Sequence, residues 1–279
     1  MDGPNVRGNW SPRRETAHCR RGEMKGETAS MLSGLRSALF FAGFFAITPP
    51  FALLIFAFWH LPYGVREDTA RLWCRASLLW LRICCGVRHR VIGLENLPPG
   101  PAVVMSNHQS AWDTIAYRTI FPARLSWVVK RELFRLPFYG WALKALEEIA
   151  VGEQSPRDAL REVEGKGAAH MRSGRWVVIF PEGMRVRHGE LGRFLQGGAR
   201  LACATGMPVV PVAVDSGYCW STQDWRKRPG LITVRIGPPI ETAQRSPVEV
   251  SRLARDWIEA QLTDIGTARP GRTTHAGLQ

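Results

Sequence analysis

Residues 38–59 contain no charged side chain, and this run limits most strongly what the chain can fold into. As a straight helix the run would be about 33 Å long, enough to cross the hydrocarbon core of a bilayer. Pro49 and Pro50 interrupt it, and each proline removes a backbone hydrogen-bond donor. Two half-helices of about 16 Å would each reach only half-way across. The run therefore predicts membrane attachment, as a kinked span or as a segment that dips in and returns.

Basic residues lie on both sides of this run, which bears on its orientation. They are Arg20, Arg21, Lys25 and Arg36 before it and Arg66, Arg71, Arg75 and Arg82 after it. A single span is expected to show an asymmetry of basic residues. A cleaved signal peptide is not indicated, because the run starts far from residue 1 and lacks a small-residue cleavage site. The symmetry favours an anchor in one leaflet, with the rest of the chain at the cytoplasmic face of the inner membrane.

Residues 69–87 are predicted to form a second helix, in which arginines and tryptophans alternate with aliphatic side chains. Such a helix suits a layer of anionic lipid headgroups. It equally suits a core helix with a solvated basic edge. We therefore expect membrane-anchoring helices over residues 31–88, after a basic tail (1–30) that has too little apolar periodicity to fold.

The charge balance indicates a polyanionic partner. Lys and Arg outnumber Asp and Glu by 37 to 24, giving a net charge of +13. Nucleic acid and an anionic membrane surface both fit such a balance. Nucleic-acid binding leaves residues 38–59 unexplained, so we expect the membrane and no nucleic acid. The six cysteines form no C-x-x-C pair, which predicts free thiols in a reducing compartment.

After residue 89 short apolar runs alternate with helical stretches, as is typical of an α/β domain. Strands are expected at 102–106, 126–129, 176–180, 209–214 and 231–236. Ser155-Pro156 and Ser246-Pro247 read as helix starts. We predict a mixed or parallel central sheet flanked by helices over residues 89–265, with a disordered tail at 266–279. Ligands of such sheets bind beyond the carboxyl ends of the strands.

The first candidate site follows the strand predicted at 102–106, where the sequence reads N-H-Q-S-A-W-D. His108 with Asp113 would make a general base and the carboxylate that orients it. Positions five apart on one helix point about 140° away from each other. His108 is therefore expected in the turn before a helix, with Asp113 reaching back from its first turn. Alternatively, Ser110 and Asp113 form only a helix capping box and His108 is a loop histidine.

Three further blocks carry candidate residues. In F-P-E-G-M-R (180–185), Gly183 permits an unusual turn and Arg185, with Arg187 beyond it, presents a guanidinium that can grip a phosphate. Arginines beside a turn are, however, more commonly surface residues without a binding role. K-R-E-L-F-R-L-P (130–137) sets basic beside apolar side chains, which suits an amphiphilic substrate or a strand-to-helix corner. V-P-V-A-V (210–214) reads as a structural strand.

These four blocks, in this order, resemble the motifs of the 1-acylglycerol-3-phosphate acyltransferase family over roughly residues 90–240. The resemblance implies that His108 deprotonates the free hydroxyl of a lysophospholipid, which attacks the thioester of acyl-CoA or acyl carrier protein, and that Asp113 orients His108. It implies no metal and no cofactor, because the thioester already activates the acyl group. The expected substrate-binding residues are Asn107, Lys130, Arg131, Glu182, Gly183 and Arg185.

Two departures from the family pattern leave the acceptor open. Met184 stands where a threonine or serine is usual, and no arginine follows the strand at 149–151. Glycerol 3-phosphate, another lysophospholipid or a lyso-aminolipid are therefore alternative acceptors. A lipid-binding protein without catalysis is a further alternative, against which the presence of both His108 and Asp113 argues. The sequence shows no hydrolase elbow, phosphate loop or dinucleotide fingerprint.

Overall fold

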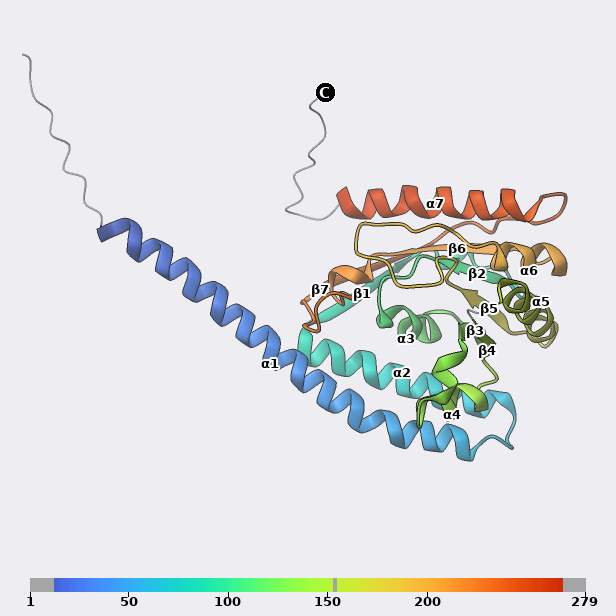
Figure 1. The fold of residues 1–279 in the computed structure, drawn as a ribbon, viewed down its shortest axis with the longest axis horizontal. Helices are drawn as coiled ribbons and strands as arrows, with labels where there is room; N and C mark the ends of the chain where they lie inside the picture. Colours follow the sequence, from blue (N-terminus) through green and yellow to red (C-terminus); the bar gives the residue numbers. More distant parts are fainter. Residues whose placement is uncertain (1–12, 153–154, 268–279) are drawn as a thin grey trace, which may run out of the picture.

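The computed structural model describes residues 13–152 and 155–267, which form a seven-stranded sheet covered by helices (Figure 1). The helices are α1 (Arg13–Ala57), α2 (Tyr63–Cys85), α3 (Ala111–Ile120), α4 (Tyr139–Ala145), α5 (Pro156–Arg172), α6 (Gly197–Thr205) and α7 (Pro247–Thr267). Short 3₁₀ helices are η1 (Leu94–Asn96), η2 (Arg131–Arg135) and η3 (Ser216–Tyr218). The strands are β1 (Val87–Ile92), β2 (Val103–Ser106), β3 (Leu125–Lys130), β4 (Ile149–Val151), β5 (Trp176–Ile179), β6 (Val209–Val214) and β7 (Gly230–Ile236).

The sheet is mixed, with strand order β1-β7-β6-β2-β5-β3-β4. Strands β6, β2, β5, β3 and β4 run parallel to one another, and β7 joins β6 in antiparallel register. Every residue of β2, β5 and β6 is buried, as expected for parallel strands covered on both faces. The prediction of a mixed sheet flanked by helices is confirmed.

Helices cover both faces of the sheet and produce two apolar cores. On one face α2 and α3 pack against alternate strand residues, among them Val104, Val178 and Val212. On the other face α5, α6 and α7 pack against the neighbouring positions, such as Val103 and Val177. Successive strand residues point to opposite faces, which is why adjacent valines serve different cores. Helix α1 lies outside α2, on the side of the molecule opposite α7 (Figure 1).

Helix α1 continues through both prolines, so the expected break at Pro49 and Pro50 is wrong. The Thr48 hydroxyl, one residue earlier, donates to the Phe44 carbonyl at 2.6 Å and accepts from the Trp73 indole at 3.2 Å. This pair of bonds ties the proline-containing turn to α2. Packing against a neighbouring helix therefore compensates for the missing backbone donors.

Helices α1 and α2 differ from the expected organisation at the start of α1 and at the end of α2. Helix α1 begins at Arg13, inside the tail expected to be disordered; residues 14–48 contain no proline and many helix-favouring residues. Residues 1–12 and 268–279 lie outside the described part of the chain. At the other end, α2 buries Leu81 and Cys85 in the core beneath the sheet. The structure thus favours the core-helix interpretation of residues 69–87, and the folded unit includes α2.

Candidate active site

The predicted blocks meet at one edge of the sheet. His108 follows β2, Glu182 and Arg185 follow β5, and Lys130 ends β3. These strands are parallel, so their carboxyl ends point the same way. That edge is where ligands bind in sheets of this kind.

His108 and Asp113 form a buried hydrogen-bonded pair, as the spacing predicted. His108 lies in the turn before α3, and its Nδ1 is 2.8 Å from Asp113 Oδ2. The same carboxylate oxygen accepts from the backbone N–H groups of Gln109 at 2.9 Å and Ser110 at 3.0 Å. Ser110 is the N-cap of α3 and completes a capping box with Asp113. The capping and pairing interpretations are therefore both correct, because one carboxylate serves the helix and the histidine.

Phe180 and Arg185 contact the His108 ring at other positions. Phe180 stacks on the ring with 3.8 Å between centroids and an interplanar angle of 11°. With Nδ1 facing a carboxylate, Nδ1 carries the proton and Nε2 presents a lone pair. Arg185 Nε lies 3.4 Å from that Nε2. The ring nitrogen that carries the lone pair thus faces the exposed guanidinium of Arg185.

Glu182 braces the two loops that carry His108 and Arg185. Its carboxylate accepts from the His108 backbone N–H at 2.7 Å and from the Gly192 N–H at 2.9 Å. Burial raises the pKa of Glu182 to about 7; the two backbone N–H groups lower it, and the charge of Asp113 adds to the rise. Glu182 is 9% exposed, so its contacts are with the loops rather than with open space.

Asn107 has a positioning role in place of the expected substrate contact. Its side-chain amide exchanges two hydrogen bonds with the backbone of Val214, at 2.8 and 2.9 Å. The residue is fully buried, which leaves no surface for a substrate. Gln109 makes a similar bond, since its Oε1 accepts from the Gly217 N–H at 3.1 Å. The loop after β2 is thereby fixed to the end of β6.

The turn at Gly183 explains how Arg185 reaches His108. Gly183 has φ +68°, a left-handed conformation that glycine adopts without a steric penalty. Its N–H donates to the Phe180 carbonyl at 3.0 Å, and the Val186 N–H donates to the His108 carbonyl at 2.8 Å. The chain therefore reverses directly after β5 and lies against the His108 loop.

Lys130 and Arg131 lie farther from the pair. β5 separates β3 from β2, and two strand spacings amount to roughly 10 Å. Lys130 is exposed at the end of β3. Arg131 lies 3.9 Å from Glu162 of α5. The structure thus brings Arg185 to His108 and leaves Lys130 and Arg131 at the same edge without bringing them to the histidine.

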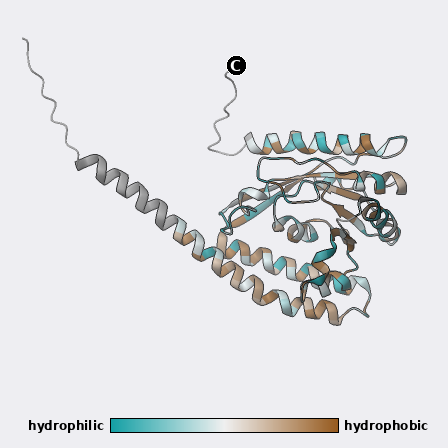
Figure 2. Ribbon diagram, in the orientation of Figure 1, coloured by the Kyte–Doolittle hydropathy of each residue, from teal (hydrophilic) through white to brown (hydrophobic). Residues whose placement is uncertain are grey.

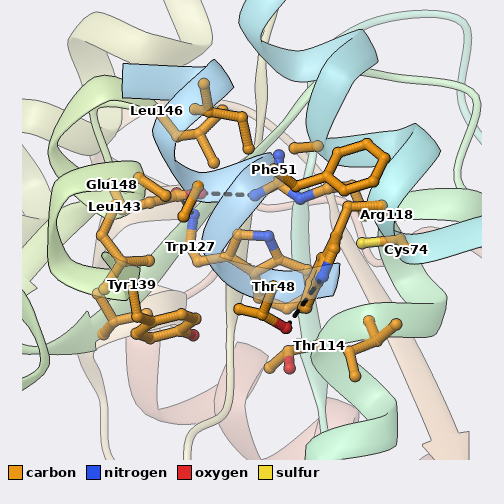
Figure 3. Close-up of a pocket in the computed structure, with 17 residues that line it drawn as sticks. Thr48, Phe51, Cys74, Thr114, Arg118, Trp127, Tyr139, Leu143, Leu146 and Glu148 are labelled. Atoms are coloured by element: carbon orange, nitrogen blue, oxygen red, sulfur yellow. Dashed lines mark hydrogen bonds and ion pairs between the residues drawn. The ribbon is translucent and has the colours of Figure 1, made fainter. Parts of the chain in front are cut away.

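An apolar pocket (Figure 3) is lined on one side by the residues that directly follow Asp113. Thr114 and Ile115, directly after Asp113, line it together with Trp127. Trp127 stacks on Phe180 with 5.8 Å between ring centroids, so the aromatic column under His108 reaches the pocket wall. The far wall is formed by apolar residues of α1, of α4 and directly after α4: Phe51, Ala52, Ile55, Ala142, Leu143 and Leu146. An apolar lining of this kind suits a flexible hydrophobic ligand.

The arrangement has the parts of a general-base site. A histidine oriented by a buried carboxylate can take a proton at Nε2, and the carboxylate stabilises the resulting imidazolium. Among the described side chains, no group of three or more His, Cys, Asp or Glu residues lies close enough to hold a metal ion. Phe180 and Gln109 were not predicted as site residues. The aromatic that precedes P-E-G was the one available signal for Phe180.

Comparisons with known proteins agree with the motifs. Residues 88–215 match the family model described as Acyltransferase. The chain is 39% identical over 209 residues to the 1-acyl-sn-glycerol-3-phosphate acyltransferase of Pseudomonas aeruginosa, covering 74% of this chain and 81% of that protein. It is 31% identical over 193 residues to 1-acyl-sn-glycerol-3-phosphate acyltransferase alpha of Homo sapiens, covering 68% of each.

A solved structure shares the fold. The crystal structure of the 1-acyl-sn-glycerophosphate (LPA) acyltransferase of Thermotoga maritima superposes with a TM-score of 0.70 at 22% sequence identity. The match covers 86% of this chain and 100% of that one. The ordered motifs, the family model and the two relatives lead to one conclusion: the chain belongs to the 1-acyl-sn-glycerol-3-phosphate acyltransferase family.

Proposed function

We propose that this protein transfers a fatty acyl group from acyl-CoA or acyl carrier protein to the free sn-2 hydroxyl of 1-acylglycerol 3-phosphate, giving phosphatidic acid. The observation that carries the proposal is the 2.8 Å His108–Asp113 pair with Arg185 Nε 3.4 Å from His108 Nε2. A base and a phosphate-binding group at that separation match an acceptor in which hydroxyl and phosphate belong to one glycerol.

In the proposed reaction His108 Nε2 takes the proton of the acceptor hydroxyl as its oxygen attacks the thioester carbonyl carbon. The tetrahedral intermediate then collapses, the C–S bond breaks, and the imidazolium returns its proton to the leaving thiolate. Asp113 keeps the proton on Nδ1 and stabilises the imidazolium. The acyl group forms its new ester bond with the acceptor, so protons and electrons balance without a metal or a cofactor.

The pocket supplies a site for one of the acyl chains. Its lining is apolar along α1 and α4, and its near end lies beside Thr114, next to the catalytic pair. In the wall, Arg118 pairs with Glu148 (Figure 3) and with Glu67, and Arg71 lies 3.5 Å from Glu67. Two carboxylates thus face two guanidinium groups, and the pocket wall holds no uncompensated charge. Burial of methylene groups there would stabilise a bound chain by about 0.8 kcal/mol each.

Arg185 is expected to grip the acceptor phosphate. A guanidinium binds phosphate through two parallel hydrogen bonds, which a lysine cannot reproduce, and misplacement of reacting atoms by about 1 Å can cost 10²-fold in rate. Arg185→Lys should therefore lose more than half of kcat/KM on lysophosphatidate, and Arg185→Ala far more. Hydrolysis of acyl-CoA by water, which needs no phosphate contact, should fall much less.

Arg187→Lys is the matched control, because Arg187 lies in the same loop and its guanidinium contacts the Gln223 side chain instead. This variant should keep acyl transfer near the wild-type rate. Equal losses of transfer and hydrolysis in the Arg185 variants would show that Arg185 supports the fold or the donor site. Unchanged transfer to lysophosphatidate would indicate a different acceptor.

We further propose that α1 attaches the protein to the cytoplasmic face of the inner membrane, within one leaflet. Ser30–Ala57 is long and apolar enough to cross a bilayer by length and composition. One side of the helix is buried against the rest of the protein from Ser37 to Ile55, a distance of about 27 Å. A helix held along that length cannot cross the membrane unless the domain enters too. The helix is apolar over this length (Figure 2), and its opposite side exposes large apolar side chains.

The attachment should resist salt, because ions do not screen the burial of apolar surface. The full chain is expected to stay in the membrane fraction after washing with concentrated salt. A variant with glutamine at the exposed positions Leu39, Phe45, Leu53 and Phe56 should move to the soluble fraction without loss of the buried core. Release of the unaltered chain by salt would overturn the proposal.

A further inference from the structure

The chain makes a strained turn just before α4. Phe138 has φ +60° and ψ −61°, and the Tyr139 N–H donates to the Pro137 carbonyl at 2.6 Å. This is a γ-turn with positive φ, which is rare for a residue with a side chain. Such strain persists only where the surrounding structure enforces it, and it is concentrated at functional positions.

The turn exposes a group of large apolar side chains. Leu136, Phe138, Tyr139 and Trp141 are 47%, 36%, 37% and 38% exposed. We call residues 136–141 the aromatic tip. Tryptophan and tyrosine settle where hydrocarbon meets polar headgroups, whereas contiguous apolar surface facing water is uncommon in a protein without a partner. We therefore expect another surface to cover the aromatic tip.

The aromatic tip continues the exposed apolar side of α1. The Phe138 and Trp141 rings are 5.2 Å apart between centroids, and Trp141 lies 5.9 Å from Phe56 of α1. Beneath them, Ala142 of α4 and Leu146, directly after α4, pack against Ala52 and Ile55 of α1. The two elements thus form one surface, and a membrane that covers α1 meets the tip as well.

The charges around the tip fit anionic lipid. Arg131, Arg135 and Lys144 are exposed on η2 and α4, and basic residues near a membrane surface are attracted to anionic headgroups. Glu132 is also exposed in this segment, but its single negative charge is outnumbered by the three basic side chains. The segment therefore keeps a net positive charge. Aromatic side chains bordered by basic ones are typical of interfacial membrane contacts.

We infer that the aromatic tip is a second membrane contact, inserted at the boundary between headgroups and acyl chains of the leaflet that holds α1. The inference rests on the proposed attachment of α1. Because η2 follows β3 at the edge that carries His108, insertion holds the reaction site against the lipid surface. The apolar pocket is lined by α1 and α4, the two elements in contact with lipid, so an acyl chain can enter it without crossing water.

Photo-crosslinking of the full chain tests this inference. p-Benzoylphenylalanine is placed at Phe138, at Phe45 of α1, or at Val248 of α7, and the protein is bound to vesicles of phosphatidylcholine and phosphatidylglycerol. Phe45 and Val248 are exposed to a similar extent, 64% and 66%, but α7 lies on the side of the molecule away from α1 (Figure 1). After irradiation, intact-protein mass spectrometry should show lipid adducts at 138 and 45 in comparable yield and essentially none at 248.

The outcomes separate the inference from the proposal on which it rests. Adducts at 45 without adducts at 138 would overturn the second contact and leave α1 attached. Absence of adducts at both positions would overturn the attachment itself. A protein–protein adduct at 138 would mean that a second copy of the chain covers the tip, which also contradicts the inference.

A kinetic comparison adds a readout that a purely structural role would not change. Phe138→Ser combined with Trp141→Ser should lower kcat/KM several-fold on long-chain lysophosphatidate presented in vesicles. The same variant should act normally on a short-chain lysophosphatidate that is monomeric in solution. Val248→Ser is the matched control and should leave both activities unchanged. Equal loss on both substrates would assign the tip to the fold rather than to the membrane.

Discussion

His108→Ala is expected to abolish acyl transfer while leaving binding of lysophosphatidate nearly intact. A neutral hydroxyl is a poor nucleophile until a positioned group takes its proton, and loss of a general base costs roughly 10²–10⁴-fold in rate. In this protein the ring is fixed from three sides, by Asp113 at 2.8 Å, by the stacked Phe180 and by Arg185. No other described imidazole shares this arrangement. The measurement is kcat of the purified variant in mixed micelles.

His60→Ala is the matched control, because His60 is exposed in the loop after α1 and should behave as wild type. Asp113→Asn should also be impaired. The amide can still accept hydrogen bonds at the start of α3, but it does not hold the proton on His108 Nδ1 as a carboxylate does. Retention of more than about a tenth of wild-type kcat by His108→Ala would show that this residue is not the general base.

Arg118→Met should strongly destabilise the fold. Arg118 bridges Glu67 of α2 and Glu148 beside β4, and both carboxylates are completely buried. Removing one partner of a buried ion pair costs about 3–5 kcal/mol, because it leaves an uncompensated charge. We expect about 3 kcal/mol, the lower end of that range, since Glu67 keeps Arg71 at 3.5 Å. The free energy of unfolding in detergent micelles, from urea titration, measures the loss.

Arg252→Met provides the contrast. Arg252 also forms an ion pair, with Asp256 at 2.9 Å, but both side chains are more than half exposed, and such pairs contribute about 0–1 kcal/mol. Replacing the buried cluster with Glu67→Gln, Arg118→Met and Glu148→Gln should restore part of the stability, because no buried carboxylate is then left unpaired. Equal stability of Arg118→Met and wild type would contradict the account.

Most of the strands and the pair itself were predictable from local sequence. Residues 209–214 form a strand with the expected bounds, because an uninterrupted apolar run between turn residues is typical of a covered parallel strand. The positions of His108 and Asp113 followed from helix geometry alone. The start of α5 behind Ser155, whose hydroxyl accepts from the Asp158 N–H at 3.2 Å, followed from capping chemistry.

Features that depend on distant residues were not predictable. β1 was missed because Arg88, His89 and Arg90 interrupt its apolar pattern; it is an edge strand, where charged side chains prevent association with other sheets. The continuity of α1 through Pro49 depends on Trp73 of α2. The role of Asn107 depends on Val214, more than a hundred residues away. Local patterns predict elements, whereas such contacts exist only after the elements have packed.

The choice of acceptor tests most directly the proposal that this site acylates a lysophospholipid whose phosphate is held beside His108. Purified protein in mixed micelles should be offered labelled acyl-CoA, and separately acyl carrier protein carrying the same chain. The acceptors are lysophosphatidate, lysophosphatidylcholine, lysophosphatidylethanolamine, a lyso-aminolipid and glycerol 3-phosphate. We predict that lysophosphatidate gives the highest kcat/KM, with phosphatidate as product, and that His108→Ala abolishes its formation. A higher kcat/KM on another acceptor, or acylation of none, would contradict the proposed function.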